Sequence, residues 1–124
     1  MAKVSVLVDT DVFIDYFNQG RFHALFDSNR FTVYYSIITK KELLTKSGLR
    51  ENERESILAE LTRCRLIALS DSITARYSDL RRRHASLDKA DALIAATALV
   101  KRFPLMTRNK RHFRMLTGLT LFGE

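Results

Sequence analysis

Val4-Ser5-Val6-Leu7-Val8, a run of mostly branched apolar residues, ends directly on the charged side chain of Asp9. A short run of this composition predicts a buried β-strand. In an α/β fold, residues just beyond the strands gather at the carboxyl edge of the sheet, where ligand sites form. The run therefore predicts a strand at residues 4–8 and a functional position for Asp9.

Three more polar side chains occupy corresponding positions later in the chain. A second β-like run, Phe31–Ser36, is followed after a short helical stretch by Glu42. Asp91 opens the longest apolar segment, and Asn109 follows a strand predicted at Pro104–Thr107. If the strands are parallel, three carboxylates and one amide meet at a single edge. Such a set of oxygen donors predicts a cation site.

Strand-like and helix-like stretches alternate along the chain. This alternation is typical of a mainly parallel sheet with helices on both faces, so we predict an α/β fold in one domain, residues 1–124. The predicted strands are residues 4–8, 31–36, 66–69, 104–107 and 119–122. The predicted helices are 12–18 after a cap at Thr10 or Asp11, 21–28, a segment capped by Ser36 or Thr39 that ends near 46, 51–64, 71–83, a segment capped by Ser86 or Asp88 that ends near 102, and 110–116.

The composition predicts an ordered protein with a basic surface. The chain has 124 residues, of which 46% are hydrophobic, so a core can form. Lys and Arg total 21 against 14 Asp and Glu, which gives a net charge of +7. A basic protein with an acidic site suits a polyanion whose phosphates meet a metal, and the alternative is a protein that is merely basic.

Cysteine usage and apolar run lengths indicate the compartment. Cys64 is the only cysteine, which excludes an intrachain disulfide and a zinc site built from cysteines. The first apolar run is too short for a signal peptide, and the longest, near residues 92–100, is far below the ~20 residues that span a bilayer. We expect a cytoplasmic protein without a membrane segment. No glycines have nucleotide-loop spacing, and no Gly-x-Ser-x-Gly motif indicates a serine hydrolase.

Two of the acidic residues also fit ordinary structural roles. Asp9 could cap the following helix, although Asp11 lies next to the helical run and fits that role better. Glu42 could be a solvent-exposed residue paired with Lys46, four positions later on the same helix. Considered one at a time, these structural roles are the simpler interpretation.

The segment around Asp91 gives the sharpest signal. Asp91 begins a helix that is apolar nearly all round and hence buried, although the helix dipole alone would favour a carboxylate there. Asp88 could be the ligand instead, but its position suits the helix cap, so we assign the ligand to Asp91. Asn109 fits a turn, or it could hold a metal-bound water through its amide oxygen.

The acidic residues carry more information as a group. Two carboxylates about 4 Å apart repel by about 4 kcal/mol at an effective dielectric constant near 20. Three together are costly unless a divalent cation or a retained proton offsets the charge. Oxygen ligands with few carboxylates favour Mg²⁺ or Mn²⁺, and a water made more acidic by such an ion can attack a phosphodiester.

Four segments resemble, in their order and spacing, the PIN-domain nucleases, and in particular the VapC-type toxins of bacterial and archaeal toxin–antitoxin pairs. They read VLVDTDVFIDYF, SIITKKELL, DALIAATAL and LMTRNKRHF. The resemblance extends from Val6 to about Phe122, and its last two segments are the most specific. It implies a three-layer α/β/α fold with about five strands. It also implies a metal-dependent ribonuclease that forms a homodimer and is silenced by a small antitoxin.

The resemblance also assigns roles within the site. Carried over residue by residue, it places the family's acids on Asp9, Glu42 and Asp91. The fourth position, acidic in many PIN domains, is Asn109 here, and this loss of one negative charge weakens the case for a second metal. Asp11 could restore that charge or cap the helix. We expect Asp9 and Asp91 to ligate Mg²⁺ or Mn²⁺, and Glu42 to ligate it or to orient the attacking water.

Supporting and basic residues complete the predicted site. Thr107 and Asn109 are expected to support the metal ligands, with Asp11 and Asp88 as further support. Basic residues crowd the sequence around Asn109, and phosphate contacts of this kind supply affinity without sequence choice. The predicted contacts with the RNA backbone are Arg108, Lys110 and Arg111.

Other functions and interfaces stay open at this point. The strand that ends in Asp-Thr-Asp also resembles the opening of haloacid-dehalogenase phosphatases, but the later Gly-Asp turn is absent and the chain is short for that fold. A non-catalytic RNA-binding protein is a second alternative. The apolar stripes on residues 12–17 and 51–64 could serve a dimer or antitoxin interface, or belong only to the core.

Overall fold

Within residues 2–123, which the computed structural model describes, four parallel strands form a sheet in the order β3-β2-β1-β4. β1, the strand predicted from the opening run, lies between β2 and β4. Because the pairings are parallel, the carboxyl ends of the strands meet at one edge. The strands are β1 (Val4–Val8), β2 (Phe31–Ser36), β3 (Arg65–Ile67) and β4 (Leu105–Met106).

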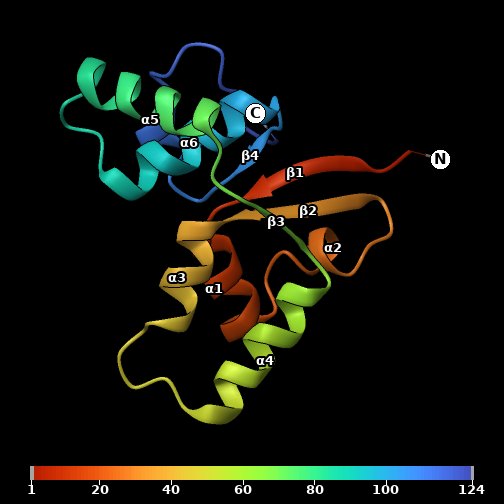
Figure 1. Ribbon diagram of the computed structural model, residues 1–124. Helices are drawn as coiled ribbons and strands as arrows, with labels where there is room; N and C mark the ends of the chain where they lie inside the picture. Colours follow the sequence, from red (N-terminus) through yellow and green to blue (C-terminus); the bar gives the residue numbers. More distant parts are fainter. Residues whose placement is uncertain (1, 124) are drawn as a thin grey trace.

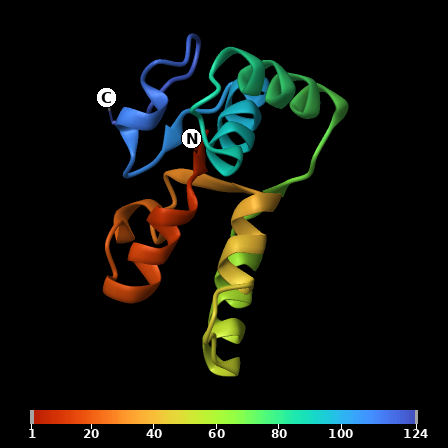
Figure 2. The same cartoon turned by 90° about the vertical axis from the view of Figure 1, so that its left-hand side faces the viewer.

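Helices cover both faces of the sheet, so the predicted three-layer α/β/α fold is confirmed (Figure 1). One face carries α1 (Thr10–Gln19), α2 (His23–Phe26), α3 (Ile37–Leu44) and α4 (Glu51–Thr62). The other carries α5 (Asp71–Arg83) and α6 (Lys89–Lys101), and α7 (Lys110–Phe113) follows β4. Figure 2 shows α1 and the α3–α4 pair as two arms that project from the sheet. In the described part of the chain, no helix is long and apolar enough to cross a membrane.

The sheet divides the core into two halves. Alternate side chains of β1 point to opposite faces, so Leu7 joins the cluster under α5 and α6, and Val6 and Val8 join the one under the other helices. In the second cluster, Phe13 is fully buried, with its ring centroid 5.1 Å from that of Phe26. β1 is thus packed on both faces, which fixes the position of the residue that follows it.

The sheet has fewer strands in the described residues than the five predicted. The expected strand at 119–122 is reduced to a single bridge between Leu105 and Leu121. There the Leu105 N–H donates to the Thr120 carbonyl at 2.9 Å, and the Phe122 N–H donates to the Leu105 carbonyl at 2.8 Å. β4 is so short that the last segment can pair with only one of its residues.

The first helix begins earlier than predicted. Asp9 is extended (φ −73°, ψ 156°) and its carboxylate accepts a hydrogen bond from the Thr10 N–H, so Asp9 is the N-cap of α1, and not Thr10 or Asp11. The N-caps of α3 and α6 are Ser36 and Asp88, each one of two predicted alternatives.

Several element ends also differ from the prediction, and two examples show the reason. β3 ends at Ile67, where the predicted strand reached residue 69, and α7 ends at Phe113, where the predicted helical segment reached residue 116. In each case the last pairing or helical hydrogen bond depends on neighbours that local sequence does not specify.

Candidate active site

Asp9 is buried at the carboxyl end of β1, with only 5% of the residue exposed. Its Oδ1 accepts a hydrogen bond from the Thr10 N–H at 2.8 Å, and its Oδ2 accepts one from the Thr107 hydroxyl at 2.8 Å. Burial and repulsion from Asp11 and Asp91 raise the pKa of Asp9 to about 7, although both hydrogen bonds act in the opposite direction. A cation in place of the retained proton would stabilise this carboxylate.

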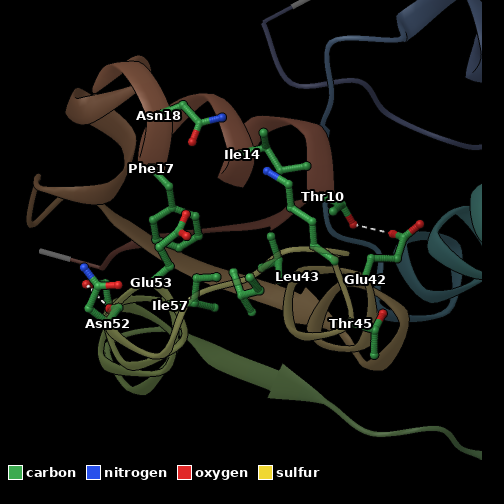
Figure 3. A pocket seen from close by; sticks show the side chains of 13 residues that line it. Thr10, Ile14, Phe17, Asn18, Glu42, Leu43, Thr45, Asn52, Glu53 and Ile57 are labelled. Carbon is green, nitrogen blue, oxygen red and sulfur yellow. Dashed lines mark hydrogen bonds between the residues drawn. The ribbon is translucent and has the colours of Figure 1, made fainter.

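Glu42 reaches the same edge from α3 and is hydrogen-bonded to Thr10 (Figure 3). The Thr10 hydroxyl donates to Glu42 Oε1 at 2.7 Å and lies 2.9 Å from Oγ1 of Thr39, which is fully buried. The Thr39 N–H in turn donates to the Ser36 hydroxyl at 3.3 Å. This chain of hydroxyl groups fixes α1 against α3. Glu42 is solvent-exposed, as its structural alternative supposed, but within the described residues it forms no ion pair with Lys46.

Asp91 lies in the first turn of α6, with 19% of its side chain exposed and its Oδ2 3.4 Å from Nδ1 of His112 on α7. Burial raises the pKa of Asp91, His112 lowers it, and repulsion from Asp88 and Glu42 raises it further. Asp88 is exposed at the N-cap of α6. Of the two, Asp91 is the residue whose charge acts on Asp9.

Asp11 and Asn109 pair with each other beside these carboxylates. Asn109 Nδ2 donates to Asp11 Oδ2 at 3.0 Å, and the Arg108 N–H donates to Asp11 Oδ1 at 3.4 Å. The Asn109 N–H donates to Thr107 Oγ1 at 3.1 Å, and the same hydroxyl donates to Asp9. Burial raises the pKa of Asp11. The Asp11 carboxyl group is thus held beside the Asn109 amide by two hydrogen bonds.

The predicted RNA-binding residues point away from the carboxylates or into solvent. The Arg108 guanidinium turns onto α1, where its Nη1 is 3.1 Å from Asp15 Oδ1. Lys110 directs its Nζ toward Gly123, and Arg111 is exposed on α7. A contact between these residues and RNA therefore stays a prediction.

The carboxylates suit a hydrated Mg²⁺ or Mn²⁺ better than a metal enclosed by protein ligands. Within residues 2–123, no three acidic, imidazole or thiol groups lie close enough together to enclose one ion. Mg²⁺ keeps several waters and is usually held by one or two carboxylates. Asp9 and Asp91 offer only oxygen ligands. A bound cation would neutralise their negative charges and so remove the repulsion between them.

Some residues at the site were not identified from the sequence. Thr10 donates to Glu42 and also contacts Thr39, and the only sequence signal was that Thr39 lies three positions before Glu42 on the same helix face. His112 contacts Asp91, and the sequence did not indicate this contact. This contact arises because α7 packs against α6, and no local sequence pattern indicates that packing.

A groove of about 650 Å³ opens beside Thr10 and Glu42, between α1 and the α3–α4 arm (Figure 3). Its apolar lining includes part of each stripe that the sequence suggested as an interface, whereas Val12, Phe13 and Leu61 from the same stripes are buried in the core. The apolar lining residues are Ile14, Phe17, Leu43, Leu49 and Ile57.

The fold and the site together define an α/β protein with a carboxylate centre suited to a hydrated divalent cation. The model of the PIN domain family matches residues 6–117. Ribonuclease VapC1 of Methanocaldococcus jannaschii is 35% identical to the chain, over 96% of this chain and 88% of that protein.

Two solved structures share the fold. VapBC2 from Rickettsia felis, bound to a DNA fragment from the promoter, has a TM-score of 0.81 at 23% identity and covers 95% of this chain and 97% of that one. A toxin–antitoxin complex from Klebsiella pneumoniae has a TM-score of 0.73 at 27% identity and covers 93% of this chain and 95% of that one. The chain belongs to the PIN-domain family, as its four motif segments predicted, and its sequence relatives are VapC-type members.

Proposed function

We propose that this protein is a metal-dependent endoribonuclease that acts as the toxin of a toxin–antitoxin pair. The observation that carries the proposal is the buried Asp9 at the carboxyl end of β1, whose pKa is raised to about 7 by burial and by repulsion from Asp11 and Asp91. The chain that carries this group is strongly basic and is related to proteins named as ribonucleases. This combination suits cation-assisted hydrolysis of a polyanion.

In this proposal, Asp9 and Asp91 hold Mg²⁺ or Mn²⁺ at the carboxyl edge of the sheet. The bound cation would polarise the phosphate and make a water a stronger nucleophile. Thr10 engages Oε1 of Glu42, so Oε2 can accept the proton of the attacking water. The water oxygen bonds to phosphorus, the bond to the leaving ribose oxygen breaks, and that oxygen takes a proton from solvent water.

Neighbouring groups keep the ligands in place. The Thr107 hydroxyl holds one oxygen of Asp9, and Asn109 holds Asp11 beside it. Asp88 occupies the N-cap position of α6, where its charge lies close enough to Asp91 to raise the pKa of that group. The cations expected to hold the RNA backbone and offset its charge are Arg108, Lys110 and Arg111.

The test is cleavage of labelled single-stranded RNA with Mg²⁺ or Mn²⁺ and with EDTA. Asp9→Asn and Asp91→Asn should abolish cleavage, and Glu42→Gln should reduce it by at least about a hundredfold if Glu42 positions the water. Glu55→Gln is the matched control, because Glu55 is exposed on α4. RNA binding without metal-dependent cleavage would instead support a binding protein, and turnover of p-nitrophenyl phosphate would support a phosphatase.

The groove between the two helical arms is our proposed site for the antitoxin. It is apolar along its floor and ends at the Thr10–Glu42 hydrogen bond, so a bound helix there would also cover the acidic site. We expect a small open reading frame that adjoins the start of this one, and its product is the partner to test. Ile14 in the groove and Ile37 outside it are both 38% exposed, so Ile14→Glu should prevent capture of that product and Ile37→Glu should not.

A homodimer would use a different apolar surface. Ile37, Leu66 and Leu69 are exposed by 38%, 41% and 55%, and Leu69 borders a shallow apolar hollow that Tyr77 and Leu93 also line. We propose that this surface pairs with its copy in a second chain. Ile37→Glu should then shift the mass measured by light scattering from dimer to monomer, whereas Ile14→Glu should leave it unchanged.

A further inference from the structure

One buried carboxylate, that of Asp15 on α1, holds two arginines from separate segments of the chain. Its Oδ2 is 2.8 Å from Nη1 of Arg21, and its Oδ1 is 3.1 Å from Nη1 of Arg108. The Asp15 side chain is 11% exposed, whereas those of Arg21 and Arg108 are 51% and 49% exposed. Two guanidinium groups against one carboxylate leave a net positive charge, and it is the cationic part that faces solvent.

This cluster lies one helical turn from the carboxylate centre. Asp11 and Asp15 are four residues apart on the same face of α1, which is about 6 Å along the helix axis. Arg108 spans this interval, because its backbone N–H donates to Asp11 Oδ1 and its guanidinium donates to Asp15 Oδ1. The two arginines therefore stand beside the acidic site without being part of it.

We propose that Arg21 and Arg108, held by Asp15, bind a backbone phosphate of single-stranded RNA that neighbours the phosphate being cleaved. This inference rests on the proposed ribonuclease function and adds a substrate subsite to it. Each guanidinium directs Nη1 to Asp15, so its other N–H donors remain for a phosphate, and guanidinium forks match phosphate oxygens. The Arg21 guanidinium carbon also lies 5.0 Å from the ring centroid of Phe22, a second restraint on its orientation.

Arg21 and Arg108 are held more rigidly than the other pair of arginines that shares a carboxylate. Arg82 and Arg83 both contact Asp79, but all three lie on one helix and the arginine side chains are 77% and 71% exposed. Arg21 and Arg108 are instead anchored from different segments by a buried group, so less side-chain entropy is lost when a phosphate binds. Asp15 is in this sense a positioning residue.

The first test is RNA affinity measured by fluorescence anisotropy in EDTA at several salt concentrations. Arg21→Gln should raise the Kd for a labelled single-stranded RNA roughly tenfold, the cost of one charged hydrogen bond. It should also reduce the slope of log K against log salt concentration by about 0.7 in magnitude, the contribution of one phosphate contact on a single strand. Arg65→Gln removes the same charge at the amino end of β3 and should leave both quantities close to wild type. Equal behaviour of the two variants would overturn the proposal.

The second test uses the sign of a charge change. Asp15→Asn makes the protein more positive, so net charge alone predicts tighter RNA binding. The positioning role predicts weaker binding, because both arginines lose their anchor. Glu55→Gln, on the exposed face of α4, is the matched control for net charge. If folded Asp15→Asn protein, judged by a cooperative thermal transition, binds as tightly as this control, the proposal fails. If Asp15→Asn does not fold, Arg21→Gln decides.

Cleavage assays separate this proposal from the nuclease proposal itself. In an active enzyme, the loss caused by Arg21→Gln should fall mainly on KM. A protein that binds RNA through Arg21 but never cleaves it upholds the subsite and refutes the nuclease. A protein that cleaves RNA equally well with Arg21→Gln and Arg65→Gln upholds the nuclease and refutes the subsite.

Discussion

Asp9→Asn is expected to stabilise the metal-free protein, and more so as the pH rises. The pKa of Asp9 is raised from 3.8 to about 7 on folding, mainly by burial. Between these values the folded protein retains a proton that the unfolded chain has released, so the free energy of unfolding falls as the pH rises from about 4 to about 7. Asparagine has nearly the same shape and cannot ionise, so it avoids this loss.

The size of the effect follows from the two pKa values. At about 1.4 kcal/mol per pH unit, the raised pKa of Asp9 costs wild type about 4 kcal/mol of unfolding free energy at pH 8 but only about 2 kcal/mol at pH 5. The advantage of Asp9→Asn should therefore grow by roughly 2 kcal/mol between these pH values. Costs of the amide that do not depend on pH, such as its altered contact with Thr107, cancel in this difference.

Urea unfolding of both proteins at pH 5 and pH 8 in EDTA measures this difference. Adding Mg²⁺ at pH 8 should then stabilise wild type and have little effect on Asp9→Asn, because only the wild-type site binds the ion in the folded state. Glu55→Gln controls for the loss of one exposed negative charge. A variant whose advantage shrinks or stays constant with rising pH would refute the reasoning.

Three other substitutions test the surroundings of Asp9. Thr107→Val should lower the free energy of unfolding by about 1–3 kcal/mol in urea titrations at pH 8, because it removes a buried donor to the Asp9 carboxylate, and Thr107→Ser should restore it. Phe13→Ala should cost about 3–5 kcal/mol in the same measurement, since this fully buried ring packs against its neighbours. Asn109→Asp should lower the melting temperature in EDTA, because it replaces a hydrogen-bond donor to Asp11 by a like charge. Adding Mg²⁺ should then raise the melting temperature of this variant more than that of wild type. A variant whose melting temperature does not respond to Mg²⁺ would contradict this.

The place of the acidic centre could be predicted because it depends on strand ends, which are local features. The apolar run before Asp9 specifies a strand, and the alanine-rich segment after Asp91 specifies a buried helix. Once alternation indicates parallel strands, both residues must lie at the carboxyl edge. Predicting that Asp9 and Asp91 lie at this edge therefore required no knowledge of contacts between distant side chains.

The details of the centre depend on tertiary packing and could not be predicted in the same way. Arg108 flanks Asn109 in sequence and suggested a phosphate contact, but its guanidinium turns back onto Asp15, a residue more than ninety positions earlier. The contact of His112 with Asp91 likewise exists only because α7 packs beside α6. The segment around Leu121 has strand-like composition, yet the two-residue β4 offers it too little backbone to pair with.

Because β1 and β4 are neighbours in the sheet, the acidic centre can form only late in the synthesis of the chain. Asp9 emerges from the ribosome well before Thr107 and Asn109, which complete its surroundings and lie almost a hundred positions later in the chain. An unfinished chain therefore exposes the aspartate without the strand that encloses it. The chain must therefore be synthesised as far as Asn109 before the centre can be assembled, and a shorter product lacks the groups that enclose Asp9.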